Sequence, residues 1–176
     1  MNLSVGKYLI ARPTIEYGFF RQSVVFVYEH TAFATAGVNL TKPTSIQFSS
    51  ISNQFGYVAQ TQDPIVYKGG PVNEQSLVML HSSEFVSSNT LITNSGLNIS
   101  SDAFMVEKLS YSAWPRHYRL FTGTSMWHAG QLKKEIQTNH WLVSDLPSDL
   151  VFEYDGDELW TKAVDYVGKA VFDPYI

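Results

Sequence analysis

The sequence predicts an α+β fold in which a mostly antiparallel β-sheet or partial barrel packs with about three helices. Runs of β-branched and aromatic residues recur along the chain, and apolar residues with helical spacing come mainly in its second half. Strands and helices do not alternate strictly, which argues against a doubly wound parallel sheet. A length of 176 residues suits a single compact domain over residues 1–176.

Three strands are expected in the first quarter of the chain. Residues 7–13, KYLIARP, predict a strand that ends at its proline, which cannot donate to a ladder. Residues 22–30, QSVVFVYEH, contain five consecutive β-formers, a pattern typical of a strand covered on both faces. Residues 36–43 predict a third strand, and the short link between the second and third indicates an antiparallel pair.

The middle of the chain gives a weaker pattern. Residues 44–62 are ambiguous between a helix and a frayed strand. Residues 63–83 predict one strand, a Gly-Gly-Pro break and a second strand through Leu77 to His81, and residues 89–100 add further β-rich sequence.

Helices are expected at three places in the second half. Asp102 and the serines before it are suited to capping a helix over 103–110. A second helix is expected over 129–139, with Ala129, Gly130 and Gln131 as its first turn. A third is expected over 155–168, capped by Asp155 and stopped by Gly168.

Two strands are expected between these helices. Residues 118–123 predict a strand that ends at Gly123 and continues as a flexible link to Ser125. Residues 150–154, LVFEY, predict a second, short strand.

Charge and composition narrow the function classes. The net charge is −4 and the only adjacent cations are Lys133 and Lys134, which are interpreted as a solvated face. No basic stripe is visible, which argues against direct binding to nucleic acid. The absence of cysteine excludes disulfides and thiolate chemistry. No signal peptide or membrane-length apolar run is evident, so a cytoplasmic location is expected, or the virion or host cytoplasm for a viral gene.

The common catalytic and cofactor motifs are missing from the sequence. There is no phosphate-binding loop, no dinucleotide-binding glycine pattern and no nucleophile elbow. No two of the five histidines are four residues apart, so no metal-ligand motif occurs. Neither a cofactor nor a metal ion is expected.

Two glycine-containing stretches could hold a ligand. Gly69 and Gly70 could expose amide N–H groups to an anion, or could simply mark a tight reversal. Trp127 with the helix start at Gly130 and Gln131 could bind an anionic or planar ligand. The alternative is that Trp127 packs on the sheet and Gly130 makes room for it.

Two histidines are candidates for acid/base chemistry, each with a structural alternative. His30 follows Glu29 at the end of a strand, where adjacent side chains point to opposite faces, so the two do not form a pair by themselves. His30 could stand at the edge of a cleft or could only close the strand. His81 shares a strand face with Leu77 and Met79, which favours a core histidine over a ligand.

Several of these segments, taken together and in order over residues 6–168, resemble the YqgE/AlgH family. The combination that carries the resemblance is Arg21-x-Ser23, Glu29-His30, Gly69-Gly70-Pro71-Val72, Leu80-His81, and Trp127 with Gly130-Gln131-Leu132. The resemblance implies a compact α+β domain and, through a genetic link to alginate production, a transcriptional regulator whose biochemical activity is not established. The family's frequent cysteine before Glu-His is Tyr28 here, so the chain is expected to be a divergent member without that thiol.

These observations favour a non-catalytic binding or regulatory domain that acts through an unknown protein partner or a small anionic ligand. Its groove would be lined by Glu29, His30, Gly69, Gly70, Trp127, Gly130 and Gln131. One alternative is a hydrolase or transferase that uses His30 or His81 with Glu29. A further alternative is a phage-encoded structural or accessory protein.

Overall fold

The computed structural model describes residues 2–172, so residue 1 and residues 173–176 of the expected unit lie outside it. Nine strands lie in this part of the chain: β1 (Tyr8–Ala11), β2 (Val24–His30), β3 (Ala34–Asn39), β4 (Pro43–Gln47), β5 (Ile65–Lys68), β6 (Val72–Ser82), β7 (Leu97–Ser100), β8 (Tyr118–His128) and β9 (Trp141–Ser144). The same residues contain five helices: α1 (Phe48–Gln54), α2 (Ala103–Ser110), α3 (Gln131–Gln137), α4 (Ser148–Glu153) and α5 (Gly156–Phe172).

The strands form one open, mostly antiparallel sheet, as expected. Its order is β4-β5-β8-β3-β2-β1-β9, and β6 pairs with both β7 and β8. The β5–β8 pair is parallel, and the other ladders between residues 2 and 172 are antiparallel. The sheet is not closed, because the described residues contain no ladder between the end strands β4 and β9.

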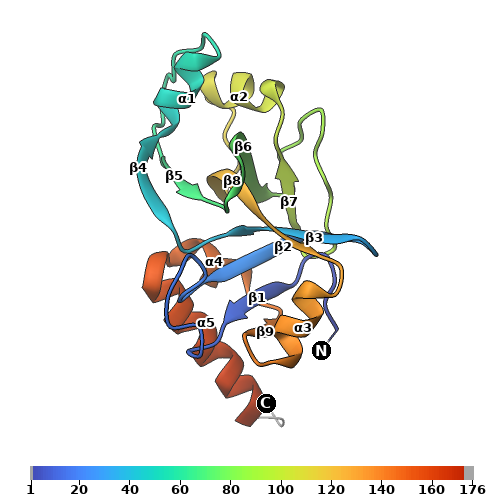
Figure 1. Cartoon of the computed structure of the whole chain (residues 1–176). Coiled ribbons are helices and arrows are strands. Elements are labelled where there is room, and N and C mark those ends of the chain that lie inside the picture. Colours follow the sequence, from blue (N-terminus) through green and yellow to red (C-terminus); the bar gives the residue numbers. More distant parts are fainter. Residues whose placement is uncertain (1, 173–176) are drawn as a thin grey trace.

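Strands β1 and β2 are covered on both faces, which explains their uniform apolar sequences. In β2, Val24 and Phe26 pack into a cluster with α4 and α5, whereas Val25 and Val27 pack into a second cluster with Trp127 and α3. Residues two apart on a strand share a face, so the two clusters lie on opposite sides of the sheet. Figure 1 shows α5 beside this part of the sheet.

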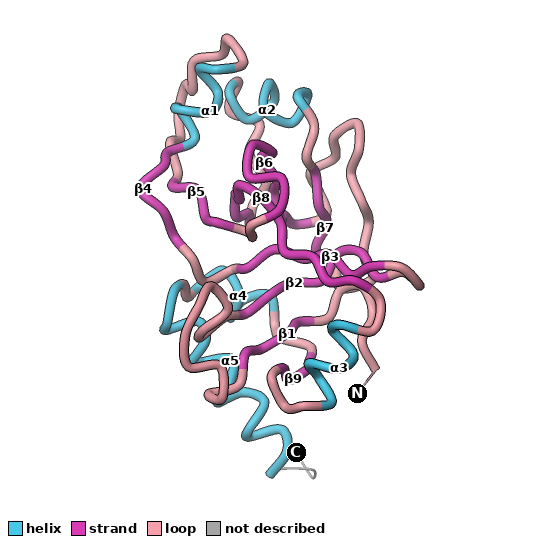
Figure 2. Tube along the Cα trace, viewed as in Figure 1, coloured by secondary structure: helices cyan, strands magenta, loops and turns pink. Residues whose placement is uncertain are grey.

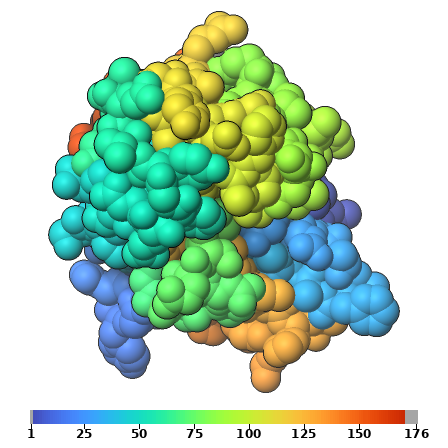
Figure 3. Space-filling view, turned by 90° about the horizontal axis from the view of Figure 1, so that it is seen from above, coloured from blue at the N-terminus to red at the C-terminus, as the bar shows by residue number. Residues whose placement is uncertain are grey.

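A third apolar cluster lies under α1 and α2. Met105, Val106 and Leu109 of α2 pack with Phe48 of α1 and with the faces of β6 and β8. Asp102 caps α2 as expected, accepting a hydrogen bond from the Met105 N–H at 2.8 Å. Figure 2 shows α1 and α2 at the end of the molecule away from α5, and Figure 3 shows them side by side. None of the helices between residues 2 and 172 has the length and apolar character needed to cross a membrane.

Strand β8 belongs to both halves of the sheet, one formed with β4, β5, β6 and β7 and the other with β1, β2, β3 and β9. The expected end of this strand at Gly123 is wrong. Its first half pairs with β5 and β6, and its second half, through His128, pairs with β3. Gly123 has φ +72°, a backbone geometry that bends the strand without ending it. The stretch up to Ser125 is therefore buried strand and not a flexible link.

The Gly-Gly pair packs directly against this bend. A Cβ on Gly70 would lie 2.1 Å from the Thr124 carbonyl, and a Cβ on Gly69 would lie 2.3 Å from the Gly123 oxygen. The Ser125 hydroxyl donates to the Gly69 carbonyl at 2.8 Å. Glycine is required here because two backbones touch where the halves of the sheet meet.

The expected strand over 150–154 is wrong. Residues 150–153 belong to the helix α4, which follows Pro147 in an extended conformation and has Asp149 in its first turn, and Tyr154 is its extended C-cap. Val151 is fully buried in the cluster beneath α5. Tertiary packing of this short apolar run overrides its strand propensity.

The helix α5 runs past its expected stop at Gly168. That glycine does not have a positive φ and has open space around its Cα, so it lies within the helix as an ordinary residue. Residues 44–62 contain both alternatives, the strand β4 and the helix α1. The strand β9 was not expected, and α1 with α4 raises the number of helices from the expected three to five in the described residues.

Candidate functional site

A cavity of about 550 Å³ lies between the β2–β3 hairpin and α3. We call it the hairpin–α3 cavity. It is lined by residues of the N-terminal segment, the hairpin, the end of β8 and α3: Asn2, Leu3, His30, Thr31, Ala32, Thr35, His128, Ala129, Gly130, Leu132, Lys133, Ile136 and Gln137. The Ala129 N–H donates to the Phe33 carbonyl at 2.8 Å and joins the hairpin tip to the chain leading into α3. Figure 3 shows these two segments in contact.

Strand pairing places His30 at this cavity and fixes its ring. His30 is opposite Thr35 in the β2–β3 ladder, so the two side chains share a face. His30 Nδ1 and Thr35 Oγ1 are 2.7 Å apart. When the hydroxyl donates to Nδ1, the ring proton is on Nε2, and residues 2–172 provide no partner for that nitrogen. The sequence contained the signal for Thr35, because a tight hairpin over 30–35 pairs its two ends.

The lining of the hairpin–α3 cavity contains no acidic residue. It contains Lys133 and two histidines, although the chain has a net charge of −4. Lys133 makes no ion pair or hydrogen bond through its side chain within residues 2–172. Lys133 and Lys134 are both exposed, in agreement with the interpretation of a solvated face, and Lys133 also lines the cavity.

Trp127 belongs to an aromatic cluster behind the cavity. It is 2% exposed, and its indole donates to Glu135 Oε2 at 3.1 Å. Trp141, also 2% exposed, donates to the same oxygen at 2.8 Å, and the ring of Phe20 stacks on Trp127. Gln131 donates to Glu135 Oε1 at 3.1 Å. Glu135 thus fastens α3 to the sheet, and Trp127 packs instead of facing a ligand.

Gly130 lines the cavity as the N-cap residue of α3, and not as the expected residue of the first helical turn. It has φ +83°, and nothing lies within 4 Å of where its Cβ would be. The helix begins at Gln131, so Ala129 and Gly130 precede it and do not form its first turn. Gly130 therefore supplies a left-handed turn and does not make room for Trp127.

The remaining predicted groove residues do not line the hairpin–α3 cavity. Gly69 and Gly70 are buried at the crossing of the sheet halves. Glu29 is exposed, and a β-bulge at Tyr28 pairs it with Ala36 on the face opposite His30. Of the expected set, the structure brings His30 and Gly130 together at one cavity.

His81 is a core histidine. It is fully buried, its Nδ1 lies 2.9 Å from the Ser82 carbonyl, and its Nε2 lies 2.8 Å from the Ser100 hydroxyl. Burial lowers the pKa of His81. Both ring nitrogens are occupied by the protein, so this side chain is not placed to exchange protons with a substrate.

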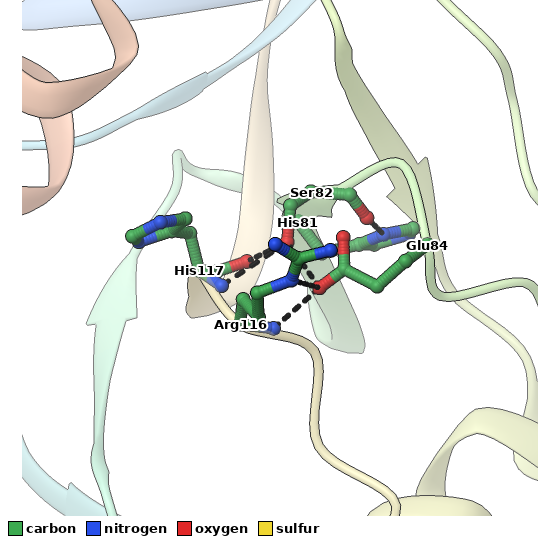
Figure 4. A network of polar contacts seen from close by, with 5 residues as sticks. All are labelled: His81, Ser82, Glu84, Arg116 and His117. Atoms are coloured by element: carbon green, nitrogen blue, oxygen red, sulfur yellow. Dashed lines mark hydrogen bonds and ion pairs between the residues drawn. The ribbon is translucent and has the colours of Figure 1, made fainter.

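A polar network next to His81 closes the end of the β6–β8 pair (Figure 4). Glu84 Oε1 accepts hydrogen bonds from the Ser82 hydroxyl at 2.7 Å and from the Arg116 backbone N–H, and the His117 N–H donates to Ser82 at 3.1 Å. The hydrogen bond from the Arg116 backbone lowers the pKa of Glu84 to about 2. A carboxylate with this pKa is a weak base, so the network fastens a loop rather than forming an acid/base site.

The Glu84 network predicts an acid-dependent loss of stability. Because the folded pKa lies below the ordinary value of 4.5, the unfolded chain binds the proton more readily, and stability rises with pH through this window. The wild type should melt at a higher temperature than Glu84→Gln. This Tm difference should have its full size above about pH 5 and shrink as the pH falls toward 2. Thermal melts in matched buffers would measure it. The control is Glu16→Gln, an exposed loop carboxylate, and equal profiles for both variants would contradict the assignment.

The buried Arg119 also serves the fold. It donates to the Leu40 carbonyl at 2.9 Å and the Tyr154 carbonyl at 3.0 Å and lies over the ring of Tyr67. Tyr67 donates its hydroxyl to Asp155 at 2.7 Å. These contacts join β8 and β5 to the start of α5. Within residues 2–172, no three histidine, cysteine or acidic side chains are grouped to hold a metal ion.

Comparison with known proteins identifies the family. The family model described as AlgH-like matches residues 8–171. The chain belongs to this AlgH-like family. A UPF0301 protein of Marinomonas sp. is 28% identical over 92% of this chain and 87% of the relative. Another UPF0301 protein, from Bradyrhizobium diazoefficiens, is 31% identical over 93% of this chain and 81% of the relative.

Two solved structures share the AlgH-like fold. The solution structure of the AlgH protein from Pseudomonas aeruginosa superposes with a TM-score of 0.80 at 22% identity, covering 100% of this chain and 98% of that one. The crystal structure of protein DIP2367 from Corynebacterium diphtheriae gives a TM-score of 0.74 at 25% identity, covering 94% and 88%. The resemblance to the YqgE/AlgH family is thereby confirmed, together with the α+β fold.

Proposed function

We propose that this AlgH-like chain is a non-catalytic binding or regulatory domain that acts through the hairpin–α3 cavity. Its occupant would be a small anionic ligand or an acidic group of a protein partner. The single observation that supports this proposal is the position of His30 in a cavity of about 550 Å³ without acidic lining residues, with its Nδ1 lying 2.7 Å from Thr35 Oγ1. Small-molecule sites typically combine such a volume with a few oriented polar groups.

A regulatory role would act through this ligand or partner instead of DNA. The net charge of −4 disfavours contact with a phosphate backbone, whose binding depends on clustered cations. Neither His81 nor the Glu84 network supports a second site, because both ring nitrogens of His81 are hydrogen-bonded within the protein and the network joins a loop to a strand.

Filling the hairpin–α3 cavity tests the proposal. Ala32 is exposed on the hairpin and lines the cavity, so Ala32→Trp should occlude it without disturbing the core. In a fragment screen detected by ¹⁵N chemical shifts, acidic fragments should perturb the Ile136 and Gln137 amides of the wild type and leave them unchanged in Ala32→Trp. Ala170→Trp, an exposed position on α5, is the matched control and should behave as the wild type does. Fragments that never perturb these amides would refute the proposal.

The His30–Thr35 pair also favours one enzymatic alternative, in a form different from the expected use of Glu29. Thr35 could transfer its proton to His30 Nδ1 while its oxygen attacks an ester carbonyl; the ester C–O bond would break, the alcohol would leave with that proton, and water would hydrolyse the acyl-threonine. Thr35 is only 5% exposed, so ring orientation is the better supported role. Turnover of acyl esters that is lost in both Thr35→Val and His30→Gln would establish the enzyme and displace the binding proposal.

A further inference from the structure

We infer that the occupant of the hairpin–α3 cavity is a small organic carboxylate with a hydrocarbon body. Its carboxylate would meet His30 and Lys133, and its hydrocarbon part would meet Leu3, Leu132 and Ile136. This inference rests on the proposed function and specifies the ligand class of the same site.

The single lysine of the lining favours a ligand with one negative charge. Lys133 is the single lysine or arginine in the lining, and no carboxylate among residues 2–172 pairs with it. A single ammonium matches a single negative charge. A second negative charge would find no second lysine or arginine among the lining residues to pair with.

The orientation of His30 supplies a directed donor beside that charge. Its Nδ1 contacts the Thr35 hydroxyl, which itself is 5% exposed and therefore held in place. With the proton on Nε2, the neutral imidazole can donate to a ligand oxygen without needing to be charged. A carboxylate, with two oxygens, can accept from Nε2 and from the Lys133 ammonium together.

The opposite part of the lining is apolar. Leu3 and Ile136 are only partly buried and leave apolar surface at the cavity, whereas Leu132 is 4% exposed and packs beneath them in the same cluster. An inorganic anion would leave the exposed parts of Leu3 and Ile136 in contact with water, whereas a hydrocarbon body would cover them and gain hydrophobic free energy. A lining divided between cationic and apolar residues thus favours an amphiphilic anion over phosphate.

Titration with three matched probes tests the inference. Sodium octanoate, octylamine hydrochloride and inorganic phosphate would each be titrated into the ¹⁵N-labelled protein, following the Leu132 and Ile136 amides. Octanoate should bind, and Lys133→Gln should weaken it about tenfold because a charge-assisted hydrogen bond is lost. Lys134→Gln makes the same charge change on the neighbouring exposed residue, which does not line the cavity, and should leave the affinity unchanged.

The outcomes separate the inference from the proposed function. If octylamine or phosphate binds as tightly as octanoate at these amides, the ligand is not specifically a carboxylate, although the cavity still binds small molecules as the proposed function requires. If Lys133→Gln and Lys134→Gln weaken octanoate binding equally, the affinity depends only on the overall charge of α3. That result would also overturn the inference. Octanoate that perturbs neither amide refutes the inference, whereas other acidic fragments that do so in the wild type would still support the proposed function.

Discussion

Replacing Gly70 with alanine is expected to destabilise the protein by at least about 3 kcal/mol, beyond the usual cost of overpacking. The added Cβ would lie 2.1 Å from both the carbonyl carbon and the oxygen of Thr124 and 2.3 Å from the Ser125 nitrogen. These are backbone atoms of β8, so no rotamer change relieves the contact, and the two halves of the sheet must separate. Urea unfolding followed by circular dichroism would measure the loss.

Gly168→Ala is the matched control for Gly70→Ala. Nothing lies within 4 Å of the Cβ that would be added at Gly168, and the residue is inside α5. The same substitution should therefore stabilise the protein by about 0.5–1 kcal/mol, because alanine has the higher helix propensity. If Gly70→Ala unfolds at the urea concentration of the wild type, the backbones do not touch as described.

Replacing Glu135 with leucine is expected to cost about 3 kcal/mol, since a buried donor without an acceptor costs roughly 1–3 kcal/mol and two would be created. The indoles of Trp127 and Trp141 both donate to Glu135 Oε2, and both rings are 2% exposed, so water cannot replace the carboxylate. Urea unfolding would give the free energy. Indole N–H signals in ¹⁵N spectra would show which tryptophans change.

Two controls isolate the role of the Glu135 carboxylate. Glu135→Gln keeps an acceptor oxygen and should recover more than half of the lost stability, with shifts confined to the Trp127 and Trp141 indole signals. Lys134→Leu places the same leucine on the exposed neighbouring position of α3 and should change stability by no more than about 0.5 kcal/mol. Wild-type stability in Glu135→Leu would mean that the indoles do not depend on this carboxylate.

The strands with uniform apolar sequence were predictable because their pattern follows from burial on both faces. β1 and β2 lie where the sequence places them, and the antiparallel β2–β3 pair follows from their short connection. α4 was missed because Leu150 to Phe152 are good strand formers, and what makes them helical is packing against α5. Local propensity cannot report a neighbour that is distant in the sequence.

The candidate site was predictable where it depended on local chemistry. His30 was singled out from its place at the end of a strand and Gly130 from an expected first helical turn, and both line the hairpin–α3 cavity. Lys133 was not distinguished from Lys134, because only the approach of the hairpin to α3 gives one of them a cavity. The glycines at 69 and 70 were recognised as special, but their reason, contact with the bend of β8, required the tertiary structure.

The shared strand β8 has a consequence for how the molecule comes apart. One continuous backbone serves as an interior strand on the α1–α2 side and as a neighbour of β3 on the cavity side. Loss of either side exposes unpaired amides of the same segment, so we infer that melting of one half removes the support of the other and heating gives a single transition. Limited proteolysis would then yield no stable fragment that retains the histidine-bearing hairpin alone.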